Sequence, residues 1–154
     1  MKKVLFLCLV VVMVCVTSGF AAPKGSSALD THLSQVNNEA LANMDTFMIR
    51  MNQVYGVTRS IVETMMNTHR FSPSEVYATY WVSQLAKKPP TYVADMYKAN
   101  RGKGWGVIAK QLGIKPGSAE FHALKRGEGP FRSFDSPGQG KGKGKEKKKK
   151  KWEN

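Results

Sequence analysis

The chain has 154 residues, a formal net charge of +13 and two cysteines. This length allows one domain with a modest apolar core, and so few cysteines exclude a disulfide-rich scaffold. A charge this positive favours an anionic partner, because a field of one sign concentrates molecules of the opposite sign.

The N-terminal residues are typical of a secretory signal peptide. Two lysines at positions 2 and 3 precede an apolar run at 4–16, and mostly small residues follow. The run is too short to span a bilayer comfortably as a permanent anchor. We expect cleavage after Ala21, which places Gly19 and Ala21 at the two small-residue positions. The sequence therefore predicts a signal peptide at 1–21 and export to the periplasm or the extracellular space.

Both cysteines, Cys8 and Cys15, lie within this predicted signal peptide. A lipoprotein alternative would modify Cys15, but such sites need a small residue just before the cysteine, and Val14 is not small. The mature chain is therefore expected to lack cysteine in an oxidising compartment, and its stability must come from an apolar core.

One long amphipathic helix is predicted over residues 28–54. Ser27 and Asp30 resemble a capping box at its start. Apolar residues then follow at spacings of three to five, which is the pattern of a helix with one buried face. These residues are Leu29, Leu33, Val36, Leu41, Met44, Met48, Met51 and Val54. Asn37 and Asn38 are the alternative break points.

Two further helices are predicted after Gly56. Thr58 is the expected N-cap of the first, which carries apolar residues at 61, 62, 65 and 66. The second has a strong start, with Ser72 as N-cap, Pro73 at the first helical position and Glu75 placed to return the hydrogen bond. Its expected buried residues are Val76, Tyr80 or Trp81, and Leu85.

The next helix is predicted to have Thr91 as its N-cap, after a proline pair at 89 and 90, and to end near Asn100. No stretch shows the alternation of apolar and polar residues that a strand requires. The prediction is an all-α domain at 22–134, a small bundle of about five to six helices joined by short turns.

A helical corner is predicted between Gly102 and Lys125, where turn residues, an aromatic anchor and positive charge coincide. Trp105 anchors a short helix, Gly113 ends it in a left-handed conformation, and Ser118 caps a second short helix. The structural positions are Trp105, Gly113, Ile114, Pro116, Gly117 and Ser118. Gly106 is expected to let Trp105 pack closely.

This stretch resembles a segment of uncharacterised exported bacterial proteins with the pattern KGWGxIAKxLGIKPGSxxFHxLK. The pattern runs from Lys103 to Lys125 and, with the residues that lead into it from about Ser72, covers about a third of the chain. The resemblance implies an exported helical module and no known activity.

A nucleic-acid alternative rests on the same corner. Ala109, Leu112, Gly113 and Ile114 have the spacing of the first half of a helix-turn-helix. The second helix lacks the expected pattern, and Pro116 lengthens the corner. Predicted export argues against this alternative as well, so nucleic acid is not the expected partner.

Positive charge is concentrated in the C-terminal half. Residues 87–134 include ten basic and three acidic residues, whereas 23–86 include four and five. The candidate anion-binding residues are Lys103, Lys110, Lys115, Lys125, Arg126, Lys147, Lys148, Lys149, Lys150 and Lys151. The last five belong to a Gly- and Lys-rich tail at 135–154, which is predicted to be disordered. The expected partners are an anionic membrane surface, an acidic polysaccharide or another polyanion.

The methionines raise a metal alternative, since thioether sulfur is a soft ligand suited to Cu(I). They are Met44, Met48, Met51, Met65 and Met66. The first three share the apolar stripe of the long predicted helix, where methionine fills the core. Core packing is the favoured interpretation, and no metal or cofactor is predicted.

Catalysis is not supported by the sequence. His32, His69 and His122 are far apart and are interpreted as surface or helix-end residues, and no nucleophile elbow is present. The glycines at 102–106 lack the spacing of a phosphate-binding loop. The sequence thus predicts an exported, non-enzymatic helical protein that binds an anionic envelope component or extracellular polymer. The alternatives are a periplasmic metal-binding or stress-response protein and a helix-turn-helix-like nucleic-acid binder.

Overall fold

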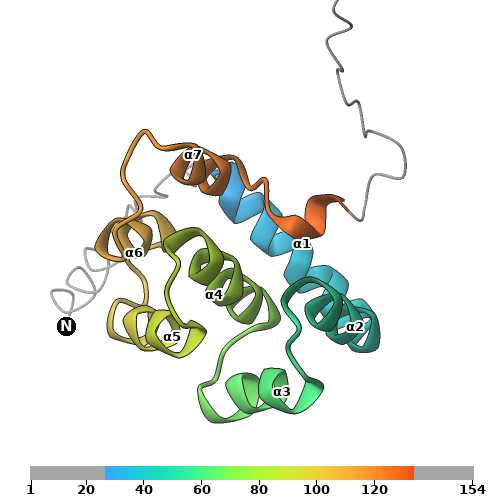
Figure 1. Ribbon diagram of the computed structural model, residues 1–154. Coiled ribbons are helices and arrows are strands. Elements are labelled where there is room, and N and C mark those ends of the chain that lie inside the picture. Colours follow the sequence, from blue (N-terminus) through green and yellow to red (C-terminus); the bar gives the residue numbers. More distant parts are fainter. Residues whose placement is uncertain (1–26, 134–154) are drawn as a thin grey trace, which may run out of the picture.

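The computed structural model describes residues 27–133 (Figure 1). The predicted signal peptide at 1–21 and the whole predicted tail at 135–154 lie outside the described residues. Residues 27–133 form seven α-helices, one short 3-10 helix and no strand, so the all-α prediction is confirmed. The elements are α1 Ala28–Ala42, α2 Met44–Tyr55, α3 Arg59–Thr68, α4 Pro73–Ala86, α5 Pro90–Ala99, α6 Trp105–Gln111, α7 Ala119–Arg126 and η1 Pro130–Ser133. None of these described helices has the length and apolar character needed to cross a membrane.

Helix α4 lies at the centre of the fold and packs against α1, α3, α5 and α6 (Figure 1). Its start follows the prediction, because Ser72 Oγ accepts a hydrogen bond from Glu75 N–H and Glu75 Oε2 accepts one from Ser72 N–H at 2.8 Å. Tyr77 and Val82 are fully buried, and Trp81 is nearly so. The helix with the best-specified start therefore also supplies much of the core.

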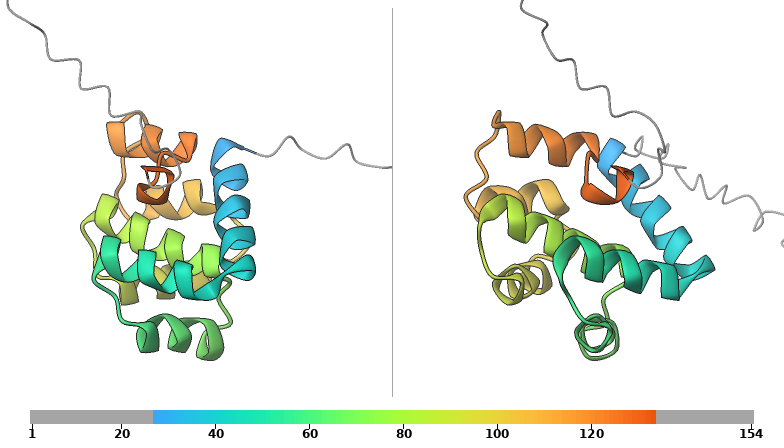
Figure 2. Two further views of the ribbon diagram at one scale, coloured as in Figure 1. Left: turned by 90° about the vertical axis from the view of Figure 1, so that its right-hand side faces the viewer. Right: turned by 45° about the vertical axis from the view of Figure 1, so that its right-hand side comes forward.

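The single long helix predicted over 28–54 is wrong, because the chain breaks at Asn43. This residue has an extended backbone, with φ −150° and ψ 91°, and its side chain accepts a hydrogen bond from Thr46 N–H at 2.9 Å. Asparagine competes well with the helical backbone for such bonds and is a good N-cap. Figure 2 shows the sharp turn between α1 and α2 that results. The break raises the helix count above the five to six expected.

Helix α5 begins two residues earlier than predicted, because Thr91 is the expected N-cap. Pro89 is its N-cap residue and Pro90 its first helical residue, while Thr91 lies inside the first turn. Proline suits this position because its fixed φ matches the helix and its missing N–H would have no partner there. The helix ends at Ala99 beside Asn100, as expected.

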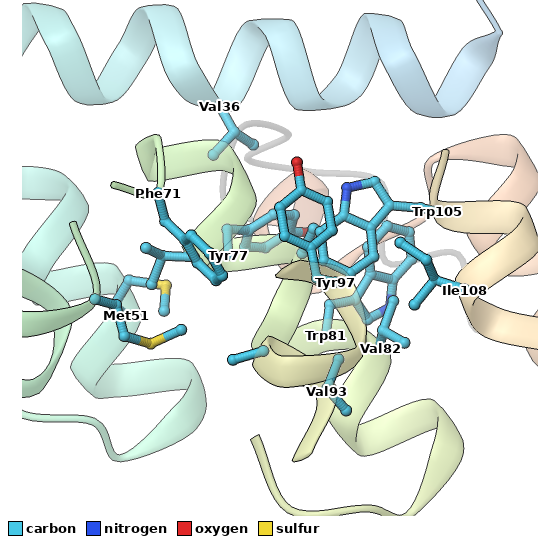
Figure 3. Close-up of a cluster of buried hydrophobic side chains, with 14 of the residues drawn as sticks. Val36, Met51, Phe71, Tyr77, Trp81, Val82, Val93, Tyr97, Trp105 and Ile108 are labelled. Carbon is cyan, nitrogen blue, oxygen red and sulfur yellow. The ribbon is translucent and has the colours of Figure 1, made fainter. Parts of the chain in front are cut away.

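Aromatic rings join the central helices in the core (Figure 3). Tyr97 of α5 and Trp105 of α6 stack with their ring centroids 4.5 Å apart and their planes 9° apart. Trp105 is 7% exposed. This stack fixes the start of α6 against α5, because large rings bury much apolar surface at a defined geometry.

The C-terminal segment 127–133 closes over α1 and α4. His32 Nε2 lies 2.9 Å from Tyr77 Oη in the interior, and Gly129 packs against both side chains. Phe131 is 1% exposed, and its ring centroid lies 4.4 Å from the ring centroid of Tyr77. The interpretation of His32 as a surface or helix-end residue is therefore wrong. His69 is the C-cap residue of α3 and His122 is exposed, which confirms that interpretation for these two.

Candidate anion-binding site

The corner between α6 and α7 is built as the sequence predicts. Gly113 has a φ of +90°, and its N–H donates to the Lys110 carbonyl at 3.0 Å. Ile114 N–H donates to the Ala109 carbonyl at 3.0 Å, and the Ile114 side chain is buried. These two bonds satisfy carbonyl groups that a helix end would otherwise leave unpaired.

Helix α7 starts at the predicted cap. Ser118 Oγ accepts a hydrogen bond from Phe121 N–H at 3.2 Å, and Phe121 and Leu124 are buried. Residues 112–118, seven in all, separate α6 from α7. A helix-turn-helix uses a turn of three to four residues, so this corner is longer than that motif requires.

The three glycines just before and at the start of α6 differ in backbone conformation. Gly102 and Gly104 have φ values of +88° and +80°, so the predicted tight turn before α6 is present. Gly106 is different, because a Cβ built on it would meet no atom within 4 Å. The expectation that Gly106 permits close packing beside Trp105 is therefore wrong.

Substitutions at Gly106 and Gly113 form a matched pair, since both sites have room for a methyl group. Gly106→Ala is expected to stabilise the fold by about 0.5–1 kcal/mol, because alanine loses less backbone freedom in a helix. Gly113→Ala is expected to destabilise it by about 1–2 kcal/mol, because alanine is strained at positive φ. Urea unfolding followed by circular dichroism measures both. Equal effects of the two substitutions would contradict the assigned helix stop.

A hollow of about 420 Å³ lies between the N-terminal end of α1, the start of α6 and one side of α7. Lysine side chains from three segments line it: Lys103 from the turn before α6, Lys110 from α6 and Lys125 from α7. Apolar side chains complete much of the lining, namely Leu29, Trp105, Val107 and Phe121. We call this feature the basic hollow.

The lysines of the basic hollow are exposed and have no carboxylate within 4.0 Å of their Nζ atoms in the part of the chain that the structure describes. Lys103 Nζ donates to Asn100 Oδ1 at 3.0 Å, and Lys110 Nζ lies 5.9 Å from the centre of the Phe121 ring. Asp30 also lines the hollow. Its carboxylate accepts hydrogen bonds from Ser27 N–H and Oγ at 3.1 and 2.8 Å. Three positive charges and one negative charge therefore surround this space.

Two predicted anion-binding residues lie elsewhere. Lys115 lines a separate hollow of about 230 Å³ together with Lys87 and Glu120. The pKa of Glu120 is lowered by a hydrogen bond from its own backbone N–H, by one from Ser118 and by the charge of Lys87, so this second hollow retains a carboxylate. Of the five candidate cations in the helical domain, three therefore line the basic hollow, and Lys115 and Arg126 do not.

Arg126 is already paired with a carboxylate. Its Nε and Nη2 atoms each lie 2.8 Å from an oxygen of Glu128, which is a two-point pair. The hydrogen bond and charge of Arg126 lower the pKa of Glu128, so the pair stays ionised at neutral pH. Arg126 is thus less available to an external anion than the lysines of the basic hollow. The predicted lysines 147 to 151 lie outside the described residues.

The methionines of the Cu(I) alternative lie in the core or beside it. No group of three or more His, Cys, Asp or Glu residues in 27–133 is placed to hold a metal ion. Met48, Met51 and Met65 are buried in the apolar core, and Met44 and Met66 are half-buried beside it. Their positions suit the gap-filling role that methionine has in cores.

Sequence reasoning missed the apolar half of the basic hollow. Leu29 comes from the start of α1, about 75 residues before α6. Nothing in the local pattern indicates that this end of α1 lies beside α6 and α7. The sequence weakly indicates that Val107 is exposed, because this residue falls outside the apolar stripe of α6.

Comparison with protein-family models, with curated proteins and with solved structures found no match for this chain. Its function is therefore argued from the residues of the site and their geometry.

Proposed function

We propose that this chain is an exported helical protein without catalytic activity that binds an anionic partner through the basic hollow. The observation that carries the proposal is the placement of Lys103, Lys110 and Lys125 around one space with no carboxylate bound to any of them in the described chain. Like charges held near one another repel, and a bound anion relieves that repulsion.

Several other cations of the described chain form ion pairs with nearby carboxylates. Lys98 Nζ lies 2.9 Å from Asp95 Oδ1, and Arg50 Nη1 lies 3.0 Å from Glu39 Oε2. Arg59 is paired with Asp45 as well. Because these cations have carboxylate partners, the lysines of the basic hollow, which have none in the described chain, are better placed to receive an anion from outside.

Export is supported by the sequence alone, through the predicted signal peptide at 1–21. An exported cation-rich protein meets anionic lipid head groups, acidic polysaccharides and other polyanions. The lysine-rich tail predicted at 135–154 adds attraction without selecting a site, because each basic residue near an anionic surface contributes about 1 kcal/mol. In this proposal the tail concentrates the protein at its partner and the basic hollow makes the defined contact.

Replacing the three lysines of the basic hollow with glutamine in the full chain is expected to weaken binding to anionic phospholipid vesicles and to dextran sulfate by roughly 10- to 100-fold. The expected size follows from about 1 kcal/mol for each lysine near an anionic surface. Glutamine keeps helix propensity at Lys110 and Lys125, so the fold is expected to persist. Vesicle co-sedimentation and biolayer interferometry measure the two affinities.

The matched control replaces Lys87, Lys88 and Lys115 with glutamine, which removes the same charge at residues that do not line the basic hollow. We expect this variant to lose no more than about threefold, because these residues do not line the basic hollow. Equal losses in the two variants would show that only net charge matters, and would overturn the proposal. So would unchanged binding in the variant of the basic hollow.

A further inference from the structure

We propose that the ligand of the basic hollow is an amphipathic anion, in which a phosphate or similar head group is joined to an apolar chain, as in an anionic lipid. This inference rests on the proposed function and specifies its ligand. A wholly polar polyanion could use the three lysines but would gain nothing from apolar walls. The basic hollow instead combines three lysines with an apolar lining.

The apolar part of the lining comes from three separate elements. Leu29 of α1, Trp105 of α6 and Phe121 of α7 are 6%, 7% and 9% exposed. A sugar hydroxyl pressed against these groups would lose its hydrogen bonds to water without replacement, which is unfavourable. An alkyl chain would leave water for an apolar surface, which is favourable. The lining therefore favours a chain over a saccharide.

Val107 adds an observation of its own. It is 40% exposed, and it lines the same space as the three lysines. Single exposed apolar residues are ordinary on protein surfaces, and Leu41 and Ile49 of this chain are further examples. Those two residues lie on α1 and α2 and do not line the basic hollow. Of these three residues, only Val107 lines the same space as the lysines. An amphipathic anion could place its charged group near the lysines and its apolar chain against Val107.

The size and charge of the basic hollow fit one head group with part of its chain. Small-molecule sites are typically about 300–1,000 Å³ with mostly apolar walls and a few converging polar groups, and this one has about 420 Å³. Three lysines and Asp30 leave a net charge of +2 on the lining. That balance suits a head group with one or two negative charges. Lysine acts as a mobile point charge, so it imposes no planar geometry on the anion and accepts a tetrahedral phosphate.

The test compares three probes on the full chain: inorganic phosphate, butyl phosphate and decyl phosphate, each below the concentration at which it forms micelles. Isothermal titration calorimetry measures their affinities at one salt concentration. We expect decyl phosphate to bind at least tenfold more tightly than butyl phosphate, since each buried methylene contributes about fourfold at most. Equal affinities for the three probes would overturn the inference.

Two serine substitutions at exposed apolar residues give the matched comparison. Val107→Ser is expected to weaken decyl phosphate binding by roughly three- to tenfold and to leave inorganic phosphate unchanged. Ile49→Ser, at a residue that is 56% exposed and away from the basic hollow, is expected to change neither. Thermal unfolding establishes that both variants are folded. Equal effects of the two substitutions on decyl phosphate would contradict the assigned apolar wall.

The inference and the proposed function can fail separately. If the glutamine variant of the basic hollow loses dextran sulfate binding but alkyl length has no effect, the proposed function stands and the amphipathic ligand is wrong. If no probe depends on the three lysines, both are wrong. Anionic phospholipid vesicles distinguish a membrane lipid from a free amphiphile as the source of the head group. If the ligand is a membrane lipid, Val107→Ser weakens binding to the vesicles. If the ligand is a free amphiphile, Val107→Ser weakens the binding of monomeric decyl phosphate only.

Discussion

Gly129→Ala is expected to lower the free energy of unfolding by roughly 1–3 kcal/mol, the usual cost of overpacking a core. A Cβ on Gly129 would lie 1.9 Å from Tyr77 Oη and 3.1 Å from His32 Nε2. The Tyr77 ring cannot move aside easily, because it is fully buried and its hydroxyl lies 2.9 Å from His32 Nε2. Relief therefore requires residues 127–133 to shift away from α1 and α4.

Urea unfolding of the purified chain measures this effect, with Gly106→Ala as the control that adds the same methyl group in open space. We expect the unfolding midpoint to fall for the first variant and to stay level or rise for the second. A midpoint for Gly129→Ala equal to that of the wild type would contradict the close contact between this segment and Tyr77.

Phe131→Ala is expected to cost about 3–5 kcal/mol, as for other fully buried phenylalanines. Phe131 is 1% exposed, and its ring centroid lies 4.4 Å from that of Tyr77 and 6.0 Å from that of Phe47. The Arg50 guanidinium lies 5.9 Å from the same ring. Removing the ring leaves a cavity at the meeting point of α2, α4 and η1, which the surrounding rings can fill only in part.

Phe131→Leu is the control, because it keeps most of the apolar volume; we expect it to cost less than about 1.5 kcal/mol. Differential scanning calorimetry of both variants separates the cavity effect from a general effect of substitution. A loss below about 1 kcal/mol for Phe131→Ala would mean that residues 127–133 contribute little to the core.

The parts of the fold that follow from short-range chemistry could be predicted from the sequence. The capping boxes at Ser27 and Ser72, the left-handed stop at Gly113 and the cap at Ser118 each depend on residues within a few positions of one another. Hydrogen bonds of this kind form whenever the local pattern is present, so their outcome depends little on the remaining chain.

The parts that depend on distant contacts could not be predicted in this way. His32 and Tyr77 are 45 positions apart, and Gly129 follows Tyr77 by a further 52. Their meeting depends on how α1, α4 and the C-terminal segment pack, which no local pattern specifies. The break at Asn43 is a different case, since asparagine as a helix cap is a local signal and the apolar stripe that continued past it concealed the break.

The positive charge of the candidate site could be predicted from the sequence, but the set of residues that line it could not. Clustered lysines in the C-terminal half indicated an anionic partner, but only the fold shows that Lys103, Lys110 and Lys125 share one space and that Lys115 does not. The pairing of Arg126 with Glu128 had a local signal, because the two residues are separated only by Gly127. The contribution of α1 required the fold.

The salt dependence of binding tests the role of the basic hollow most directly. Affinity of the full chain for dextran sulfate is measured across a series of sodium chloride concentrations, for the wild type and for the variant with glutamine at positions 103, 110 and 125. Each lysine that contacts the anion releases about one counterion, so the slope of log affinity against log salt should become shallower by roughly two to three in the variant. Parallel lines for the two proteins would contradict a defined contact at the basic hollow and leave only the unspecific attraction of the remaining charge.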